Sequence, residues 1–368
     1  MRTKLHELAD LGQSVWLDYI HRELMQSGGL RAYVDKGLRG VTSNPTIFAE
    51  AITNSDVYDD QIQQLALDGK SPEEIYEELT VEDSRMAADI LRPVFDESEG
   101  NDGFFSLEVN PHLAHDKEGT LQEAFRLFKA VDRPNIMIKV PATEEGISAF
   151  RELIEEGINI NVTLMFSLTQ YDQVAEAFLS ALETRVANVY NVRTIASVAS
   201  LFVSRADSKV DKLLDALDTP KAKSLKGKIG IANAKIAYEH FKELFQSERW
   251  EHIAEKGARI QRVLYGSTGT KNPDYSDVMY MDQLIGPNTI NTAPPKTLEA
   301  FLDHGTVALT LERNFEEARA QLEELAELGI DLDDVTHQLL MDGVKMFAEP
   351  YDSLIQTLVT KRADLVTS

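Results

Sequence analysis

The stretch NIMIKVP, residues 135–141, is short and apolar apart from one charge, which is typical of a strand buried in a sheet. Side chains alternate along a strand, so the three at even-numbered positions share one face, while Met137 and Lys139 share the other. We expect the even-numbered face to pack on helices and the other to point inward. An inward lysine needs an explanation, because a buried ammonium group is costly.

Stretches of similar character recur along the chain, and amphipathic helical patterns separate them. About eight strands that alternate with helices predict an α/β protein with a single (β/α)8 barrel, also called a TIM barrel. A doubly wound sheet is the alternative, but it calls for a G-x-G-x-x-G turn after an early strand, and the sequence has none. The expected strands are Ser14–Ile20, Leu38–Asn44, Phe104–Asn110, Asn135–Pro141, Asn159–Ser167, Thr194–Val203, Arg262–Ser267 and about Met281–Thr292.

We expect one domain over residues 1–368, with additional helices. A helical stretch at about 57–95, rich in Glu and Asp, is interpreted as an insertion between the second and third strands. A further helical segment at about 332–363 ends the chain. The other expected helices are Thr120–Val131, Thr143–Glu156, Thr169–Thr184, Ile231–Gln246 and Leu311–Leu328.

The composition excludes several classes of function. Of the 368 residues, 37 are Lys or Arg and 61 are Asp or Glu, and the net charge of −24 argues against nucleic acid as a partner. The chain has no cysteine, which excludes disulfides, thiolate metal sites and a cysteine nucleophile. No apolar run approaches the roughly 20 residues that span a bilayer, and no secretory signal is visible. We therefore expect a cytoplasmic protein with no membrane partner.

Two interpretations of Lys139 are open at this point. Burial lowers the pKa of a lysine, and the neutral amine can then attack a carbonyl group to form a Schiff base. Alternatively, Lys139 is a structural residue that pairs with an interior carboxylate, and alternation places Glu108 inward in its own strand. The strand of Lys139 by itself favours neither interpretation.

Several other expected strands carry polar residues at inward positions or close to their C-terminal ends. Barrel active sites are built at that end, from many strands at once. One inward polar residue is usually a hydrogen-bonded core residue, but several together indicate a site, because each is costly without a partner or ligand. These residues are Asp18, Thr42, Asn44, Ser106, Glu108, Asn161, Thr163 and Ser200.

A phosphorylated ligand of so acidic a chain would need a local cation. Arg205 is one candidate, because the planar guanidinium group matches phosphate oxygens. The stretch GSTGTK, residues 266–271, is another, with Ser267, backbone amides and Lys271 after a late strand, where barrels often bind phosphate. It is equally compatible with a plain turn, and its spacing is not that of a Walker A loop. The eight histidines form no recognisable metal-binding motif, so we expect no metal site.

Taken in order, these segments resemble the successive motifs of transaldolases. The resemblance extends from about residue 18 to about residue 347, and six motifs in the same order make it highly specific. The length of the chain resembles that of the longer bacterial type. The segments are Asp18, Thr42–Pro45 (TSNP), Ser106–Val109 (SLEV), Ile138–Thr143 (IKVPAT), Asn161–Ser167 (NVTLMFS) and Ser200–Arg205 (SLFVSR), followed by Asp342–Phe347 (DGVKMF).

The resemblance implies a fold and an activity. The fold is a single (β/α)8 barrel of the Schiff-base, or class I, aldolase superfamily. The activity transfers a dihydroxyacetone unit from sedoheptulose 7-phosphate or fructose 6-phosphate to glyceraldehyde 3-phosphate or erythrose 4-phosphate, in the non-oxidative pentose phosphate pathway. Sugar phosphates are the implied partners, with no cofactor and no metal. Monomer and homodimer both remain open.

The resemblance also implies catalytic roles, residue by residue. Lys139 matches the lysine that forms the Schiff base. Asp18 matches the acid/base that takes the proton of the C4 hydroxyl as the carbon–carbon bond breaks. Glu108 matches the group that moves protons through a water molecule, and Thr163 matches a residue that helps to hold this water.

The implied binding residues include one departure from the family pattern. Asn44, Asn161 and Ser200 match groups that hydrogen-bond the dihydroxyacetone hydroxyls. Arg205 and Ser267 match phosphate ligands. Many members carry a second arginine two residues after the serine that Ser267 matches, and here that position is Gly269. Lys271 is then the candidate for the missing positive charge.

Two other functions remain as alternatives. A fructose 6-phosphate aldolase-like lyase would split the sugar without an acceptor, but such relatives replace the early aspartate with a tyrosine-type acid, whereas this chain has Asp18. A barrel that has lost activity and only binds ligands would be expected to have lost at least one of Lys139, Glu108 and Asp18. Transaldolase is therefore the predicted function.

Overall fold

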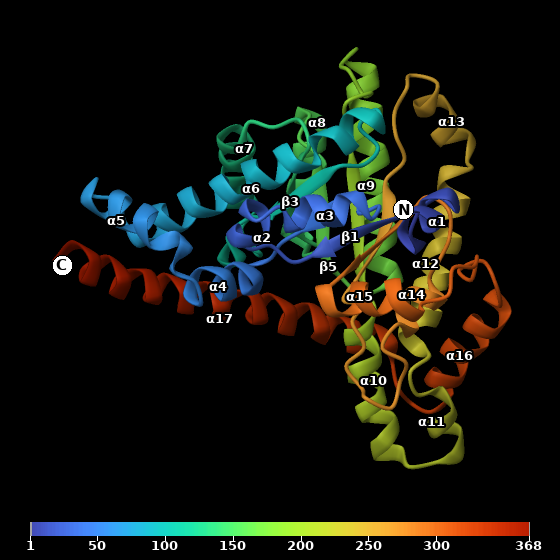
Figure 1. Cartoon of the computed structure of the whole chain (residues 1–368). Coiled ribbons are helices and arrows are strands. Elements are labelled where there is room, and N and C mark those ends of the chain that lie inside the picture. Colours follow the sequence, from blue (N-terminus) through green and yellow to red (C-terminus); the bar gives the residue numbers. More distant parts are fainter. Residues whose placement is uncertain (1, 368) are drawn as a thin grey trace.

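The computed structural model describes residues 2–367, and the side chains of residues 2–364. Eight parallel strands pair in chain order, and β8 closes the sheet by pairing with β1, so the predicted (β/α)8 barrel is confirmed (Figure 1). The strands are β1 (Gln13–Asp18), β2 (Gly40–Thr42), β3 (Phe104–Glu108), β4 (Ile136–Pro141), β5 (Ile160–Met165), β6 (Ser197–Phe202), β7 (Arg262–Gly266) and β8 (Thr289–Ala293).

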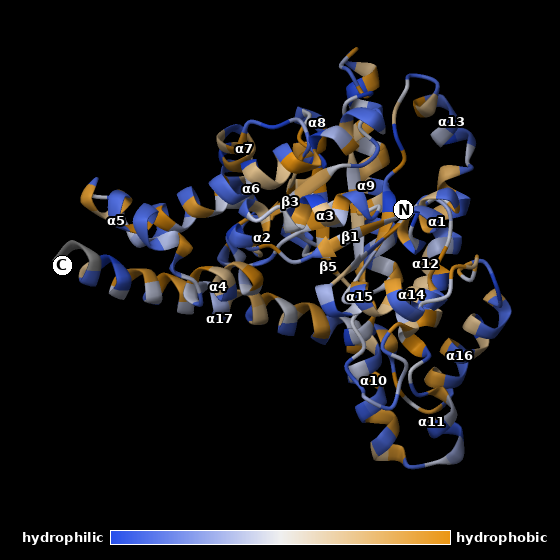
Figure 2. Cartoon of the chain, in the orientation of Figure 1, coloured by the Kyte–Doolittle hydropathy of each residue, from blue (hydrophilic) through white to orange (hydrophobic). Residues whose placement is uncertain are grey.

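Helices surround the barrel, and Figure 2 shows that long surface helices such as α6 and α17 carry both polar and apolar residues. The α-helices are α1 (Lys4–Asp10), α2 (Arg22–Gln26), α3 (Gly29–Asp35), α4 (Pro45–Thr53), α5 (Asp59–Leu67), α6 (Pro72–Glu97), α7 (Lys117–Val131), α8 (Glu144–Glu156), α9 (Leu168–Ala187), α10 (Ser204–Leu217), α11 (Pro220–Leu225), α12 (Ile229–Phe245), α13 (Glu248–Ala254), α14 (Met279–Gln283), α15 (Pro295–His304), α16 (Phe315–Glu327) and α17 (Leu332–Thr367). Two short 3-10 helices are η1 (Asp56–Tyr58) and η2 (Pro111–Leu113).

The core has an inner and an outer part, as strand alternation predicts. Ile136, Ile138 and Val140 lie in the large outer core between the strands and the helices. Met137 instead belongs to a separate apolar cluster inside the barrel, together with Trp16 and other inward residues of four further strands or their starts. The expected alternation in β4 is therefore confirmed, and it brings Lys139 inward as well.

A charged network closes the N-terminal end of the barrel. Asp102, just before β3, accepts hydrogen bonds from Ser14 Oγ at 2.6 Å, Trp16 Nε1 at 3.2 Å and Arg262 Nη2 at 2.9 Å. Arg39 lies 3.6 Å from the same carboxylate. A cavity of about 330 Å³ remains beside this network, and a larger one, of about 590 Å³, lies at the C-terminal ends of the strands, where barrel active sites are built.

Short connections at that end carry the helix caps. Asn44, Thr143 and Ser167 each accept a hydrogen bond from a backbone N–H in the first turn of the helix that follows, α4, α8 and α9 respectively. Each of these residues comes directly or almost directly after a strand. The caps therefore fix the point at which the chain turns from the barrel mouth into the outer helix layer.

Helix α17 is a single helix of 36 residues that crosses the molecule (Figure 1). It packs on α4, α5, α6 and α10, and Gly343 allows it to approach the side chain of Leu164 on β5. Ion pairs hold it at both ends, with Lys209 Nζ 2.9 Å from Asp342 and Lys361 Nζ 2.7 Å from Asp59. The predicted C-terminal helical segment thus packs on helices around the barrel, and at Gly343 it approaches β5.

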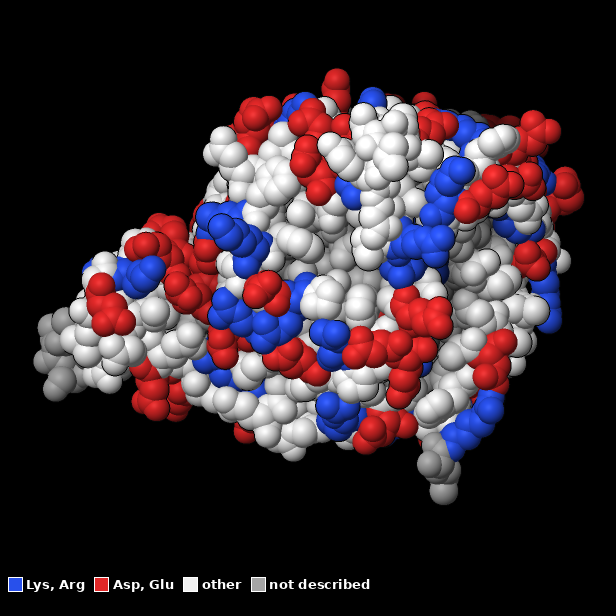
Figure 3. Space-filling model, turned by 90° about the horizontal axis from the view of Figure 1, so that it is seen from above, with Lys and Arg blue, Asp and Glu red and all other residues white. Residues whose placement is uncertain are grey.

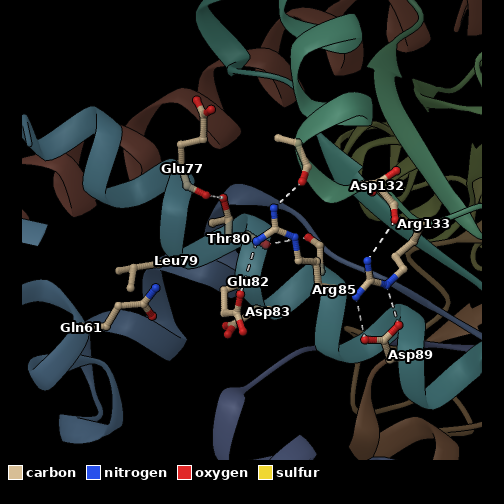
Figure 4. A network of polar contacts seen from close by, with 12 residues as sticks. Gln61, Glu77, Leu79, Thr80, Glu82, Asp83, Arg85, Asp89, Asp132 and Arg133 are labelled. Carbon is tan, nitrogen blue, oxygen red and sulfur yellow. Dashed lines mark hydrogen bonds and ion pairs between the residues drawn. The ribbon is translucent and has the colours of Figure 1, made fainter.

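The stretch 57–95 contains α5 and most of α6, which polar contacts attach to the barrel. Asn135, at the start of β4, donates to the carbonyl oxygens of Ala88 and Gly103, at 2.8 Å each. Figure 4 shows Arg133 paired with Asp89 through its Nε and Nη2 donors, at 2.6 and 3.0 Å. Helix α6 is thereby fixed to the start of the strand that carries Lys139.

The last expected strand was wrong in its first half. Residues 279–283 form α14, and β8 begins only at Thr289. The apolar residues that suggested a long strand, among them Met281 and Ile285, are buried in the outer core instead. Gly286 and Pro287 interrupt the stretch, and proline has no N–H for the sheet.

Strand β5 also departs from simple alternation. Its register against β6 shifts between Val162 and Met165, and Leu164 has a positive φ of 55°. Simple alternation would place Leu164 with Val162 in the outer core, but Leu164 joins a separate cluster with Phe347 of α17. This bulge links the C-terminal end of β5 to the helix that covers it.

Charges of both signs lie intermixed on the surface, as the face in Figure 3 illustrates. Arg249, for example, binds Glu176 and Glu183 through short charge-assisted hydrogen bonds. Within residues 2–367, no helix combines the length and the apolar character required to pass through a bilayer.

Candidate active site

A cavity of about 590 Å³ opens at the C-terminal ends of the strands. Seven of the predicted site residues line it, and the other three, Glu108, Asn161 and Thr163, are buried. Residues of six strands or their following loops thus converge on one cavity, as the sequence predicted for a barrel site. The seven lining residues are Asp18, Asn44, Lys139, Ser200, Arg205, Ser267 and Lys271.

Lys139 stands on β4 at the base of this cavity and is only 4% exposed. Its Nζ donates one hydrogen bond, to the carbonyl oxygen of Ser43 at 3.0 Å. Sheet register places Glu108 of β3 and Asn161 of β5 directly opposite it on either side. The amine is therefore flanked by two polar inward side chains, and the cavity lies above it.

Glu108 is the carboxylate beside Lys139, with Oε2 at 3.4 Å from Nζ. Burial raises the pKa of Glu108 to about 7, although the charge of Lys139 acts in the opposite direction. A carboxyl group with this pKa exchanges protons readily near neutral pH, as a general acid or base should. The pair is thus compatible with both interpretations of Lys139. Glu108 is a structural partner of the lysine, and it can also carry protons.

Two buried oxygens near this pair lack hydrogen-bond partners within the part of the chain that the structure describes. They are Glu108 Oε2 and Thr163 Oγ1. Apart from the ion pair of Glu108 Oε2 with Lys139 Nζ, neither oxygen has a partner among the described residues, whereas most buried polar groups in proteins are hydrogen-bonded. A water molecule or a substrate hydroxyl would satisfy them.

Asp18, at the end of β1, is held by a short chain of hydroxyl groups. Thr42 Oγ1 on β2 donates to Asp18 Oδ1 at 2.8 Å, and it lies 2.8 Å from Thr292 Oγ1 on β8. The sheet register pairs Asp18 with Thr42 directly. One carboxylate oxygen is thus fixed, and the side chain lines the cavity that contains Lys139.

Three inward polar residues form a hydrogen-bonded row across β3, β5 and β6. Ser200 Oγ donates to Asn161 Oδ1 at 2.7 Å, and Asn161 Nδ2 donates to Ser106 Oγ at 3.1 Å. Both ends of the Asn161 amide are therefore oriented by their neighbours. Asn44, which caps α4 with its Oδ1, reaches the cavity from the opposite side of the barrel.

Arg205 projects from the first turn of α10 and lies between two aromatic rings. Its guanidinium carbon is 5.3 Å from the Phe202 ring centre and 5.7 Å from that of Phe347. Among the described residues no carboxylate lies within ion-pair distance, and its one polar contact is Met346 Sδ at 4.0 Å. Burial lowers the pKa of Arg205, while Asp18 and Glu108 oppose this shift. The arginine is thus held in place with its donors free for an anion.

Ser267 and Lys271 line the same cavity as Arg205. At the position where many family members carry the second arginine, a Cβ atom on Gly269 would lie 3.2 Å from Pro294 and 3.3 Å from Thr297, so a larger residue would need a small shift of these neighbours. The loop after β7 therefore packs tightly on the turn between β8 and α15. That turn brings a further cation, Lys296, to the cavity wall.

Sequence analysis missed Lys296, Thr292 and the aromatic contact of Phe347. Lys296 follows two prolines at the expected end of the last strand, a position that could have marked it as a barrel-mouth residue. Thr292 was hidden because the last strand was expected to start too early. The ring of Phe347 lies 5.9 Å from Lys139 Nζ, over 200 positions further along the chain, and no local pattern signals that contact.

The cavity, its buried lysine and its polar rows define a barrel enzyme of the aldolase type, and comparisons with known proteins identify the family. The model of the family described as transaldolase/fructose-6-phosphate aldolase matches residues 15–358, and the chain belongs to this family. A transaldolase of Trichodesmium erythraeum is 47% identical, over 97% of both chains. Transaldolases of Parafrankia sp. and Thermobifida fusca are 46% and 45% identical, over 97% and 99% of this chain and 98% and 99% of their own lengths.

These comparisons confirm the resemblance that the motifs indicated. They support transaldolase function, and with it an enzyme of the transferase class. The substrates, the covalent mechanism and the roles of single residues are the subject of the proposal that follows.

Proposed function

We propose that this enzyme transfers a dihydroxyacetone unit from sedoheptulose 7-phosphate to glyceraldehyde 3-phosphate, giving erythrose 4-phosphate and fructose 6-phosphate, in the non-oxidative pentose phosphate pathway. The observation that carries the proposal is the buried Lys139–Glu108 pair at the base of a cavity that Asp18 and Arg205 also line. The pair supplies a nucleophile and a proton carrier at one point. The rim supplies a second acid/base and an anion ligand.

The first stage is Schiff-base formation. Lys139 Nζ adds to the C2 carbonyl of the ketose, and the carbinolamine then loses its hydroxyl as water to leave an iminium ion. That loss needs a proton, which Glu108 delivers through a bridging water. The orphaned oxygens of Glu108 and Thr163, which lack partners in the described structure, support a water site between them.

The second stage is carbon–carbon cleavage. The Asp18 carboxylate removes the proton of the C4 hydroxyl, the C3–C4 bond breaks, and its electron pair moves toward the iminium nitrogen as the aldose leaves. A neutral enamine of three carbons remains on Lys139. The hydrogen bond from Thr42 supports this role, because it fixes Asp18 at the edge of the cavity.

The third stage is transfer. The enamine must survive until an acceptor aldehyde arrives, add to it with return of the proton from Asp18, and then be released by water. Asn44, Asn161 and Ser200 hold the hydroxyls of the three-carbon unit. The oriented row of Ser200 and Asn161 supports this role, because its donors and acceptors are fixed before the substrate binds.

The phosphate group is bound at the opposite rim by Arg205, Ser267 and Lys271. The aromatic rings around Arg205 support this assignment, because they hold the guanidinium without using its donors. Lys296 lines the same wall and adds positive charge.

Release of glyceraldehyde 3-phosphate from fructose 6-phosphate, with and without erythrose 4-phosphate, tests the proposal. We expect continuous release with the acceptor and at most one equivalent per site without it. Continuous release without an acceptor would identify the lyase reaction of the same family. No release under either condition, from folded protein, would contradict both. The Lys139→Ala variant is the blank for the assay.

A further inference from the structure

The loop between β7 and α14, residues 267–278, carries Ser267 and Lys271 and lies against α10, which carries Arg205. Its first residue is tied to α10 by two contacts. The backbone N–H of Ser204 donates to the Ser267 carbonyl at 3.0 Å, and the two hydroxyl oxygens are 2.9 Å apart. The candidate phosphate ligands therefore sit on two segments whose relative position decides whether they can act together.

The far end of this loop and the start of α14 are tied to α10 by two tyrosine–aspartate pairs, of which Tyr280–Asp207 is buried and Tyr275–Asp211 is partly buried. Tyr280 Oη donates to Asp207 Oδ2 at 2.9 Å, and Tyr275 Oη donates to Asp211 Oδ2 at 2.7 Å. The aspartates are one helical turn apart on α10, and Asp207 is only 1% exposed. Asp207 is also two residues after Arg205, in the same turn of the helix.

The second oxygen of each aspartate is bound by the backbone before and at the start of α12. Gly230 N–H donates to Asp207 Oδ1 at 2.7 Å, and Gly227 N–H donates to Asp211 Oδ1 at 3.0 Å. Glycine is required for this approach, because a Cβ atom at Gly230 would lie 2.7 Å from the carbonyl oxygen of Val203. The carboxylates are therefore rigidly placed, and each leaves one oxygen for its tyrosine.

The aspartates also face several lysines. A small cavity of about 240 Å³ beside them is lined by Lys212, Lys226 and Lys271. Lys226 is engaged by Asp215 at 2.6 Å, but Lys271 lines both this cavity and the active-site cavity. Since an unpartnered buried carboxylate attracts the nearest cation, the tyrosine hydroxyls decide whether Lys271 stays available for a phosphate.

We infer that Asp207, Asp211, Tyr275 and Tyr280 form a latch that holds the β7–α14 loop on α10 and thereby sets the affinity of the enzyme for the phosphate group of its substrates. The inference rests on the proposed function and deepens it. The four residues are positioning residues, because they act through Arg205, Ser267 and Lys271. Without the latch, the loop moves away from Arg205 and Lys271 turns toward the aspartates.

The test is binding of glucitol 6-phosphate, which has the phosphate group but no carbonyl for a Schiff base, measured by titration calorimetry. Tyr280→Phe removes one hydroxyl and should weaken binding about tenfold, as expected for a hydrogen bond to a charged group. Tyr275→Phe, which removes the partly buried hydrogen bond from the loop itself to Asp211, should weaken it about threefold. In the transfer assay the same variants should raise KM for sugar phosphates with kcat within about twofold of the parent.

The control is Tyr58→Phe, which removes a buried hydrogen bond from Tyr58 Oη to Asp83 at 2.8 Å, and one from the Arg22 N–H to Tyr58 Oη at 3.1 Å, outside the active-site cavity. It should lose similar thermal stability and bind glucitol 6-phosphate as the parent does. Equal affinities in Tyr280→Phe and Tyr58→Phe would overturn the latch, as would a fall in kcat without a change in binding. Glucitol 6-phosphate binding that responds to the latch, in an enzyme that does not transfer, would instead contradict the proposed function alone.

Discussion

Both ends of the barrel bury a carboxylate, but the two carboxylates differ in how many hydrogen bonds they accept. At the N-terminal end, both oxygens of Asp102 accept hydrogen bonds, from Ser14 and from Arg262 among others. At the C-terminal end, Glu108 Oε2 and Thr163 Oγ1 have no hydrogen-bond partner among the described residues. Buried oxygens without a partner among the described residues also occur at the N-terminal end, in Gln13, Asn135 and Gln261, so the difference concerns the two carboxylates and not the two ends as a whole.

The two buried carboxylates differ in what they do: Asp102 stabilises the fold, whereas Glu108 is available for chemistry. A saturated network such as that of Asp102 contributes specificity to the fold and leaves nothing for a ligand. An incomplete network costs stability, and it persists in a natural protein where a substrate or water completes it. Glu108 is also the carboxyl group whose pKa burial has raised, to about 7. We therefore expect substitutions around Glu108 to act mainly on catalysis, and substitutions around Asp102 to act mainly on stability.

The largest effect is expected for Lys139→Ala. Loss of the nucleophile should lower the transfer rate on the order of 10⁵-fold while the protein stays folded by circular dichroism. The matched control is Lys235→Met at another buried lysine, whose Nζ donates to the carbonyls of Thr310 and Arg313 at 3.1 and 2.7 Å. That variant should lose stability and keep its rate. Equal losses of activity in both variants would mean that removing any buried lysine lowers the rate, and that Lys139 has no special role.

The next effect is expected for Arg205→Ala. Removal of the guanidinium should raise KM for fructose 6-phosphate about a hundredfold, with kcat changed less than about threefold, because the contact is equally strong in the ground and transition states. Steady-state kinetics measures both constants. An unchanged KM would remove Arg205 from the phosphate site and leave its aromatic contacts with a structural role only.

A smaller effect concerns pH. Because burial raises the pKa of Glu108 to about 7, its carboxyl is largely protonated at pH 6 and largely ionised at pH 8. Loss of water from the carbinolamine requires the protonated form, so the rate of Schiff-base formation should fall about tenfold between these values. Single-turnover trapping at each pH measures that rate. In Glu108→Gln the profile should be slow and flat, and a parent-like slope in this variant would assign the titration to another group.

The smallest effect on catalysis is expected at the opposite end, for Asp102→Asn. This change leaves Arg262 and Arg39 without a buried carboxylate and should lower the free energy of unfolding by about 3 kcal/mol. Denaturant unfolding measures the loss. The transfer rate per folded molecule should stay within about twofold of the parent. A large loss of rate in protein that remains folded would show that Asp102 also affects catalysis, contrary to this expectation.

Much of this arrangement was predictable because a strand has a period of two. Alternation in three strands was sufficient to place Lys139, Glu108 and Asn161 on the inner face, and the register then set them side by side. Eight apolar stretches between helical patterns were sufficient to predict the barrel. These features depend on residues close in sequence.

The features that were missed depend on contacts between distant residues or on local irregularity. The bulge that turns Leu164 toward α17 breaks the period on which the prediction relied. Helix α14 was taken for part of a strand, because a short buried run such as that around Met281 has no distinguishing period. The latch joins Asp207 to Tyr280, 73 positions apart, through side chains that are unremarkable in sequence.

The most direct test of Lys139, at the C-terminal end of the barrel, as the catalytic centre is borohydride trapping with fructose 6-phosphate, followed by peptide mass mapping. The account predicts a reduced three-carbon adduct on Lys139 and none on Lys235, although both lysines are buried, at 4% and 7% exposure. Addition of erythrose 4-phosphate before the borohydride should remove the adduct. No adduct on any lysine of the folded protein, or an adduct on Lys235, would contradict the account.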